Sequence, residues 1–197
     1  MRFYEWASTS ENNSVVWHLH IHNWRNDFEL SWRLQEAQPF GEGEWIQEAP
    51  AEWDEEGPLT DMPFNPNFHL VSPRLRALLE ELGLGAEIQF LPVRVVGEKS
   101  GREVGVYYVA HFLRRISCLD LEHSVGVEFY EPDYFRPEKR GKIRAVWRAV
   151  LRREAVGEAR VFRVDEYVYI VVIREDVKVA MEGAGITGCW FQELEVV

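Results

Sequence analysis

The segment from residue 35 to residue 71 sets the strongest limit on how this chain can fold. It shows no regular hydrophobic period and carries eight prolines and glycines: Pro39, Gly41, Gly43, Pro50, Gly57, Pro58, Pro63 and Pro66. A stretch of this length without regular structure is unusual in a compact domain and is either functional or poorly ordered. Apolar side chains interspersed along it predict that it packs against the protein: Trp45, Ile46, Trp53, Leu59, Met62 and Phe64. We therefore expect an acidic, aromatic-rich N-terminal subdomain of strands and a long loop over residues 1–71, followed by an α+β domain over residues 72–197.

The same region concentrates the negative charge of the chain. Residues 34–73 contain no lysine or arginine but nine acidic residues. Residues 1–73 hold 3 basic and 13 acidic side chains, whereas residues 74–197 hold 19 and 20. An acidic surface with large aromatic side chains suits the binding of a basic macromolecule. The acidic balance disfavours direct binding to nucleic acid or to an anionic membrane, because phosphate-rich surfaces require clustered Lys and Arg.

The predicted partner-binding residues lie in the most acidic part of this segment, where two exposed indoles would serve as interface anchors. They are Glu44, Trp45, Glu48, Glu52, Trp53, Asp54, Glu55 and Glu56. The alternative is a solubilising loop that contacts no partner.

Two alternating stretches near the N-terminus predict a β-hairpin. In residues 15–22, Trp17, Leu19 and Ile21 share one face and three histidines share the other. Residues 28–34 repeat the alternation, and residues 23–27 would turn the chain between the two strands.

The clearest helix is predicted to begin at Ser72. The Ser72 hydroxyl can accept hydrogen bonds from first-turn amides, Pro73 suits the first helical position, and Gly83 would end the helix. Leu75, Leu78, Leu79 and Leu82 fall on its apolar face.

The remaining pattern predicts more strands than helices. Strands are expected at 88–96, 104–113, 125–130, 167–173 and 189–197, and a helix at 176–182. Pro92 should place the first of these strands at an edge or a bulge, and residues 143–151 fit either a strand or a helix. The predicted fold class is α+β, a mainly antiparallel sheet with a few packed helices and a β-rich N-terminal part.

Composition limits the location of the protein. Cys118 and Cys189 form no CxxC pair and suit small buried side chains in a reducing compartment. The N-terminal residues lack a long apolar region, and the longest apolar run, residues 167–173, is too short to span a membrane. We therefore expect a cytoplasmic protein with no secretory signal and no membrane partner.

Three histidines form the sharpest chemical candidate. On a regular strand His18, His20 and His22 would point to one side about 7 Å apart, a geometry that can offer two ligands to one metal. No further ligands are identifiable in the sequence, and the solvent face of a half-buried strand is the favoured interpretation. We therefore expect no metal site and no cofactor.

Two other groups of residues carry a weaker signal. Asp120, His123 and Ser124 are the residue types of a nucleophilic triad, but no nucleophile elbow surrounds Ser124, and a capped turn is the favoured interpretation. Basic clusters at 114–115, 136–144 and 148–153 could hold a phosphate or an acidic partner, or pair with nearby glutamates.

Several ordered motifs in the second half carry a family resemblance. They are Phe68-His69-Leu70-Val71-Ser72-Pro73-Arg74-Leu75, Gln89-Phe90-Leu91-Pro92-Val93, Cys118-Leu119-Asp120-Leu121-Glu122-His123-Ser124, Val161-Phe162-Arg163-Val164 and Gly185-Ile186-Thr187-Gly188-Cys189-Trp190-Phe191. In this order and spacing, residues 62–197 resemble the myxobacterial-type immunity-protein domain of bacterial polymorphic toxin systems. The resemblance implies a strand at 143–151, no catalytic residues, and fold-defining roles for Asp120, Ser124, Phe162, Arg163 and Gly188.

The resemblance also implies a function. An immunity protein binds a cognate toxin, often a basic nuclease, and blocks it without catalysis. An acidic face would accelerate the encounter, and the N-terminal part would then set partner specificity. The alternatives are a metal-dependent enzyme that uses His18, His20 and His22, and a non-catalytic assembly subunit; the oligomeric state stays open.

Overall fold

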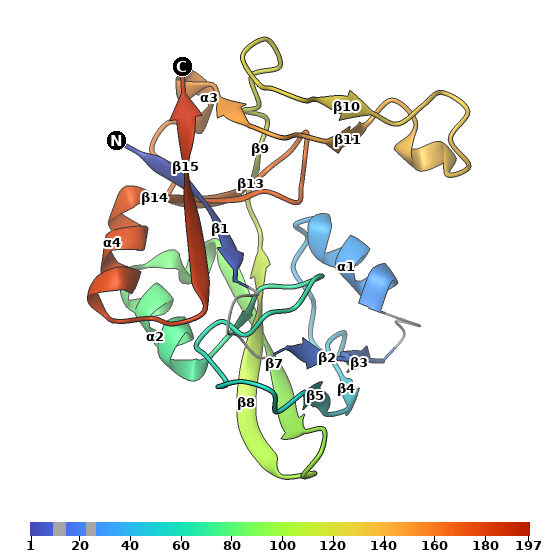
Figure 1. Ribbon diagram of the computed structural model, residues 1–197, viewed down its shortest axis with the longest axis vertical. Helices are drawn as coiled ribbons and strands as arrows, with labels where there is room; N and C mark the ends of the chain where they lie inside the picture. Colours follow the sequence, from blue (N-terminus) through green and yellow to red (C-terminus); the bar gives the residue numbers. More distant parts are fainter. Residues whose placement is uncertain (10–14, 23–26) are drawn as a thin grey trace.

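The computed structural model describes residues 1–9, 15–22 and 27–197, and its two main sheets contain most of the strands (Figure 1). The larger sheet has six strands, with β1 next to the C-terminal β15 and β14. Its strands in spatial order are β12 (Val150–Leu151), β15 (Cys189–Val196), β1 (Phe3–Ser8), β14 (Val171–Arg174), β13 (Val161–Val164) and β9 (Arg115–Ile116).

The smaller main sheet has five strands and is built around one long hairpin. Its order is β2 (Val16–Trp17), β5 (Ala51–Trp53), β7 (Ile88–Gly97), β8 (Glu103–Phe112) and β6 (Leu70–Val71). Two further strand pairs are β3 (His20–Ile21) with β4 (Gln47–Ala49), and β10 (Glu128–Phe129) with β11 (Ile143–Ala145). Most pairs are antiparallel, and the exceptions are β12–β15, β13–β9 and β5–β7.

The helices are short and lie beside the sheets. They are α1 (Asp27–Gln35), α2 (Pro73–Glu81), α3 (Arg153–Val156) and α4 (Glu175–Gly183), with 3₁₀ turns at η1 (Leu84–Ala86) and η2 (Pro137–Lys139). The α+β class with a mainly antiparallel sheet is therefore confirmed. Among the described residues, no helix has the length and apolar content needed to cross a membrane.

The helix predicted at Ser72 is confirmed, together with its caps. The Ser72 hydroxyl accepts the Leu75 amide at 3.1 Å, and Pro73 occupies the first turn. Gly83 follows the last turn with a φ of +77°, in the left-handed region that glycine adopts without steric cost. Leu75 and Leu79 are buried.

The β7–β8 hairpin is also confirmed, and Pro92 lies where a missing N–H does no harm. Pro92 pairs with Tyr108 on one side, while on the other side β5 reaches only Val95–Gly97. The Pro92 carbonyl oxygen accepts the Trp45 indole N–H at 2.8 Å, so a side chain borders this part of β7. The edge-like environment expected of a proline within a strand is present locally.

Three buried clusters form the core. In the first, α2 and α4 place Leu75, Leu79, Val177 and Met181 against Trp6. The second surrounds Phe3 and Phe162 of the six-stranded sheet, and the third joins α1 to one face of the five-stranded sheet through Leu30, Leu34, Val93 and Val95.

The predicted hairpin at the N-terminus is wrong in its second strand. Residues 28–34 lie in helix α1, whose buried Leu30 and Leu34 are four residues apart and face the third cluster. Residues 15–22 do not form one strand, because His18 has a φ of +55° and separates β2 from β3. Trp17 consequently points outward instead of joining Leu19 and Ile21. Residues 23–26 of the expected turn lie outside the described part.

The prediction that residues 35–71 pack against the protein is confirmed, since Phe40, Ala51, Met62 and Phe68 are buried. Strands at 143–145 and 150–151 confirm the strand interpretation of residues 143–151, and β15 and α4 match their predicted ranges closely. In the stretch 167–173 only Val171–Ile173 belong to a strand, β14. The division at residue 71 stays a prediction, and β1 and β5 pair with strands from beyond residue 71.

Candidate protein-binding surface

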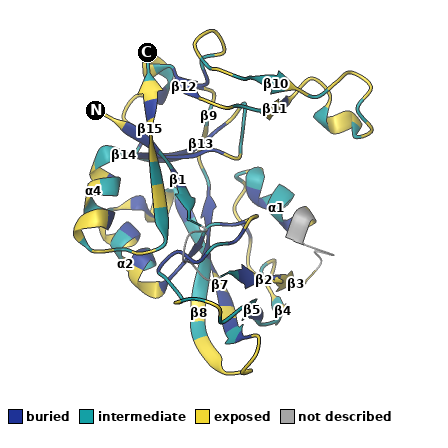
Figure 2. Cartoon of the chain, in the orientation of Figure 1, coloured by how far each residue is buried: buried dark blue, intermediate teal, exposed yellow. Residues whose placement is uncertain are grey.

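The side of the five-stranded sheet that faces away from the third cluster carries a partly exposed row of side chains. Register places Trp17 beside Glu52, Glu52 beside Val96, and Val96 beside Glu103, so these side chains share one side of the sheet. We call this set, completed by the neighbouring pair Arg94 and Val106, the outer face. Trp17 is 38% exposed and Val106 is 37% exposed. Figure 2 shows the hairpin end of β8 largely exposed.

The acidic loop of residues 42–48 borders this face. The Gln47 side-chain amide donates to the Arg94 carbonyl oxygen at 3.0 Å, and its oxygen accepts the Arg94 amide at 2.7 Å. Glu42, Glu44 and Glu48 are exposed on this loop. The outer face and this loop, which meet at Gln47 and Arg94, carry more carboxylates than cations.

Trp45 and Trp53 do not stand exposed as the sequence predicted. Both are half-buried and pack against the third cluster. The Trp45 ring meets Phe40 edge to face at 5.2 Å between centroids. The expectation of two exposed indoles is therefore wrong, although a role of either residue in partner binding stays a prediction. Trp17, which the alternating pattern placed inward, is the indole that this surface presents.

Several of the predicted carboxylates hold the local structure together. Glu55 accepts the backbone amides of Lys99 and Ser100 at 2.7 and 2.8 Å, which ties the acidic segment to the β7–β8 turn. Hydrogen bonds from Ser100 are the main reason that the pKa of the Glu55 carboxyl lies below its ordinary value. Asp54 accepts the Val15 amide at 3.2 Å and the Glu56 amide at 3.2 Å. The Glu55 and Asp54 carboxylates therefore stabilise the local backbone, whether or not they also contact a partner.

The other predicted carboxylates differ in their partners. Glu48 meets His22 Nδ1 at 2.7 Å, Glu56 meets Lys99 Nζ at 3.3 Å, and Glu44 accepts the Gly41 amide at 2.5 Å. Within the described part of the chain, the predicted residue Glu52 forms no ion pair, and neither does Glu42, which was not among the predicted residues. These two are the carboxylates whose charge is most available to a partner.

Asp61 belongs to the acidic stretch in sequence but is buried in the structure. One carboxylate oxygen accepts the Ser72 hydroxyl at 2.7 Å, and the other accepts the Thr187 amide, the Thr187 hydroxyl and Arg74 Nη1, each at 3.1 Å. Asp61 thus links the acidic segment, the start of α2 and the loop before β15.

Replacing Asp61 with alanine should lower the free energy of unfolding by roughly 2–4 kcal/mol, because several buried donors would lose their acceptor. Urea unfolding measures this change. Asp61→Asn should cost less, since one acceptor oxygen remains, and Glu81→Ala, at an exposed carboxylate, is the control. A midpoint for Asp61→Ala equal to that of Glu81→Ala would contradict the structural role.

The three histidines do not converge on one point. The positive φ of His18 interrupts the expected strand, and the rings of His18 and His20 stack at 6.3 Å between centroids. His22 turns to Glu48. Among the described residues, no group of three His, Cys, Asp or Glu side chains is placed to hold a metal ion.

Asp120 caps a turn, as the favoured interpretation predicted. Asp120 Oδ1 accepts the backbone amides of Glu122 and His123 at 3.0 and 2.9 Å, and the Ser124 hydroxyl accepts the Val150 amide at 3.0 Å. The His123 amide is the largest contribution that holds the pKa of Asp120 below its ordinary value. Asp120 therefore caps the turn, and Ser124 Oγ connects the turn to β12.

The chain belongs to the Immunity protein family (Imm11), whose model matches residues 11–196. The match extends well beyond residues 62–197, so the limit drawn from the sequence motifs was too narrow and the acidic segment lies within the family region. No curated protein matches the sequence. Membership assigns an immunity function to the chain and implies a toxin as its partner.

Proposed function

We propose that this protein neutralises a cognate bacterial toxin by occlusion: it binds the toxin and covers the toxin's functional site. The toxin would be a basic protein that meets the outer face and the acidic loop 42–48 in the cytoplasm. The observation that carries this proposal is the pairing of the exposed Trp17 indole with Glu52 on an open sheet face, next to a loop without basic residues. Protection would then need no catalysis.

The charge distribution supports this mode of action. A concentration of carboxylates attracts a basic partner over a distance comparable to the Debye length and raises the association rate. Tryptophan is enriched among residues that dominate binding energy, because it buries a large area at small entropic cost. Trp17 would act as the anchor, while Glu42, Glu48 and Glu52 would steer the encounter.

Co-expression with the product of the neighbouring reading frame tests the function itself. We expect the neighbour alone to kill the host, and this protein to restore growth and co-purify with it. Rescue without a complex would reject occlusion. Stoichiometric transition metal in protein purified without a histidine tag would revive the enzyme alternative, and stable association with a harmless partner would favour an assembly subunit.

The binding surface is tested by reversing charges that hold little local structure. We expect Glu42→Lys, Glu48→Lys and Glu52→Lys together to slow association with the toxin about tenfold or more at low salt, with a smaller effect at high salt. The matched control is Glu81→Lys, Glu122→Lys and Glu154→Lys, three exposed carboxylates outside this surface. Equal association rates for both triple variants would reject the acidic surface as the docking site.

A further inference from the structure

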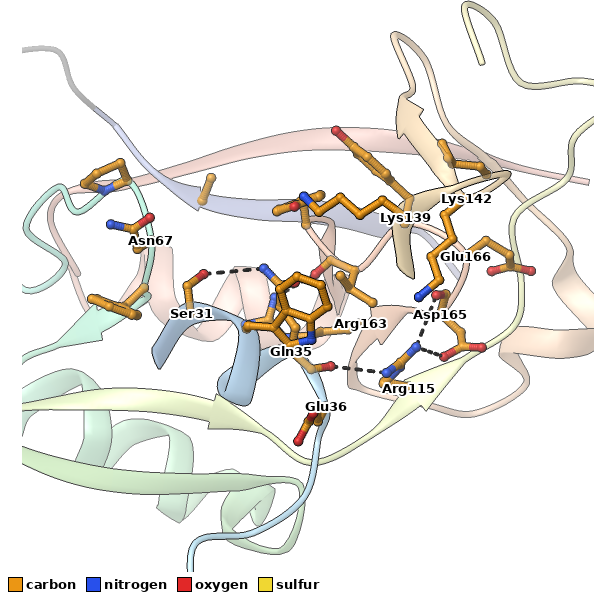
Figure 3. A pocket seen from close by; sticks show the side chains of 18 of the residues that line it. Ser31, Gln35, Glu36, Asn67, Arg115, Lys139, Lys142, Arg163, Asp165 and Glu166 are labelled. Carbon is orange, nitrogen blue, oxygen red and sulfur yellow. Dashed lines mark hydrogen bonds and ion pairs between the residues drawn. The ribbon is translucent and has the colours of Figure 1, made fainter. Parts of the chain in front are cut away.

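A cleft of about 910 Å³ lies away from the outer face, between α1, the loop 64–69, the turn 165–169 and the arm (residues 130–142) that joins β10 to β11. Figure 1 shows the arm extending beside α1, and Figure 3 shows Gln35 of α1, Arg163 of β13 and Lys139 and Lys142 of the arm around the cleft. Small-molecule sites typically occupy about 300–1,000 Å³. The cleft therefore has the size of a ligand site.

Arg163 is a buried cation in the wall of this cleft. The residue is 6% exposed, and it donates one hydrogen bond, to the Val168 carbonyl oxygen at 2.8 Å. Its Nε is buried and has no hydrogen-bond partner among the described residues. Burial and the nearby Arg115 lower the pKa of the Arg163 guanidinium to about 10. A buried charge normally has a counter-charge, since desolvation alone is costly.

The acidic residues of the cleft are already engaged and do not neutralise Arg163. Asp165 pairs with Arg115 at 2.5 Å. Glu166 accepts the Ser117 hydroxyl at 2.7 Å and the Cys118 amide at 3.2 Å. No carboxylate of the described chain forms an ion pair with Arg163. The carboxylates of the cleft lining thus bind other groups, and Arg163 is a buried cation without a carboxylate partner.

The opposite wall combines cations with aromatic rings. Lys139 Nζ lies 5.2 Å from the centre of the Tyr130 ring and 5.8 Å from that of Trp32, so it connects the arm to α1. Lys142 is exposed at the cleft. Further rings in the lining are those of Phe64, Phe129, Tyr167 and Tyr169. Aromatic faces bind planar ring systems by stacking, and arginine binds phosphate through parallel hydrogen bonds.

We propose that the cleft binds a small phosphorylated ring compound of the size of a nucleoside monophosphate, with Arg163 holding the phosphate. The ring would stack on the aromatic lining, and Lys142 would add long-range attraction. Such a ligand supplies the anion that Arg163 lacks within the protein. This site is separate from the outer face, so its success or failure does not depend on toxin binding.

Isothermal titration of the full chain with AMP, GMP, CMP and UMP tests the site. At least one monophosphate should bind about tenfold or more tightly than its nucleoside, because the nucleoside supplies no anion to Arg163. Inorganic phosphate should bind at least tenfold more weakly than that monophosphate, because it cannot stack. Absence of binding by all four would overturn the proposal, and equal binding of inorganic phosphate would overturn the ring-binding part.

Two variants locate the ligand in the cleft. Arg163→Lys keeps the charge but loses the paired N–H donors, and should weaken the best monophosphate about tenfold. Lys142→Glu alters an exposed position that the fold does not need, and should weaken it several-fold. Arg153→Glu, an exposed cation outside the cleft, should leave binding unchanged, and circular dichroism checks that each variant folds. Unchanged affinity in both cleft variants would reject this cleft as the site.

Discussion

Lowering the pH from 7 to 5 should reduce the free energy of unfolding by about 3–4 kcal/mol, through two enclosed histidines. His111 is fully buried, and its Nε2 donates to the Gln38 carbonyl oxygen at 2.7 Å. His69 keeps some exposed surface, but its ring packs edge to face against both Trp6 and Phe112, and its Nε2 donates to the Trp6 carbonyl oxygen at 2.9 Å. Both rings are thus neutral, with the proton on Nε2.

Burial is the main cause that lowers the pKa of each ring to about 4, and the charge of Arg163 adds to it. In the unfolded chain a histidine has a pKa of about 6.5. Below pH 6.5 the two histidines are therefore protonated in the unfolded state but stay neutral in the native state. Stability is therefore fully present above pH 6.5 and falls as the pH drops toward 4. The carboxyl groups whose pKa is lowered, such as Asp176 at about 2, act at lower pH.

Urea unfolding at pH 7.5, 6 and 5 measures the effect. His111→Gln should lose about half of the pH dependence, because glutamine does not titrate, while His123→Gln, at an exposed histidine, should retain it. Glu5, whose pKa is raised by burial, acts in the opposite sense but is common to all variants. A wild-type midpoint that does not change between pH 7.5 and 5 would contradict the neutral, enclosed state of both rings.

The sequence predicted best those elements whose signals are local. The Ser72-Pro73 start, the leucine face and the Gly83 stop of α2 all depend on contacts within one helix. The β7–β8 hairpin likewise joins neighbouring segments through a short turn, so its alternation and turn residues are sufficient to predict it.

Elements shaped by distant contacts were mispredicted. The stretch 28–34 alternates like a strand, yet Leu30 and Leu34 also fit one helical face, and the packing of that face against Val93 and Val95 decides in favour of the helix. The left-handed conformation of His18 has no marker in the sequence, because glycine is the residue that usually indicates it. The left-handed conformation of His18 interrupts the strand, and Trp17 therefore points to solvent and not to the core.

The candidate surface could be predicted in its charge but not in the role of each residue. Glu55 binds a turn that begins more than forty residues later, and Asp61 binds Thr187 across 126 residues, so both look like surface carboxylates in the sequence. Arg163 left a better signal, since it is a lone charge within the apolar strand Val161–Val164. A charge in such a position indicates either a structural partner or a ligand.

Replacing Gly188 with alanine should lower the free energy of unfolding by about 3–5 kcal/mol, from backbone strain and overpacking combined. Gly188 has a φ of +83°, in the left-handed region that favours glycine. A methyl group there would overlap the Thr60 hydroxyl and the Met62 carbonyl oxygen, and would lie 2.9 Å from Thr60 Cβ. A loss of this size is a large fraction of the stability of an ordinary domain.

The clash cannot be relieved by a small shift of the chain, because hydrogen bonds hold both sides. The Thr9 amide donates to the Gly188 carbonyl oxygen at 3.0 Å, and the Met62 amide donates to the Thr187 carbonyl oxygen at 3.0 Å. Moving residue 188 outward would strain both bonds and the Asp61–Thr187 contacts beside them. These contacts between residues 60–62 and residues 187–188 join the end of the acidic segment to the strand β15. Their loss should therefore also destabilise the segment that we propose contacts the toxin.

The guanidinium unfolding midpoint of Gly188→Ala is compared with that of Gly85→Ala. The comparison separates the clash at residue 188 from the general effect of replacing a glycine. Gly85 has open space around its Cα and no positive φ, so its replacement should be neutral or slightly stabilising. Adding Thr60→Ala to Gly188→Ala should recover only part of the loss, because the Met62 carbonyl oxygen and the left-handed φ remain. Full recovery would assign the whole effect to the Thr60 side chain, and equal midpoints for Gly188→Ala and Gly85→Ala would show that residues 60–62 do not pack against Gly188.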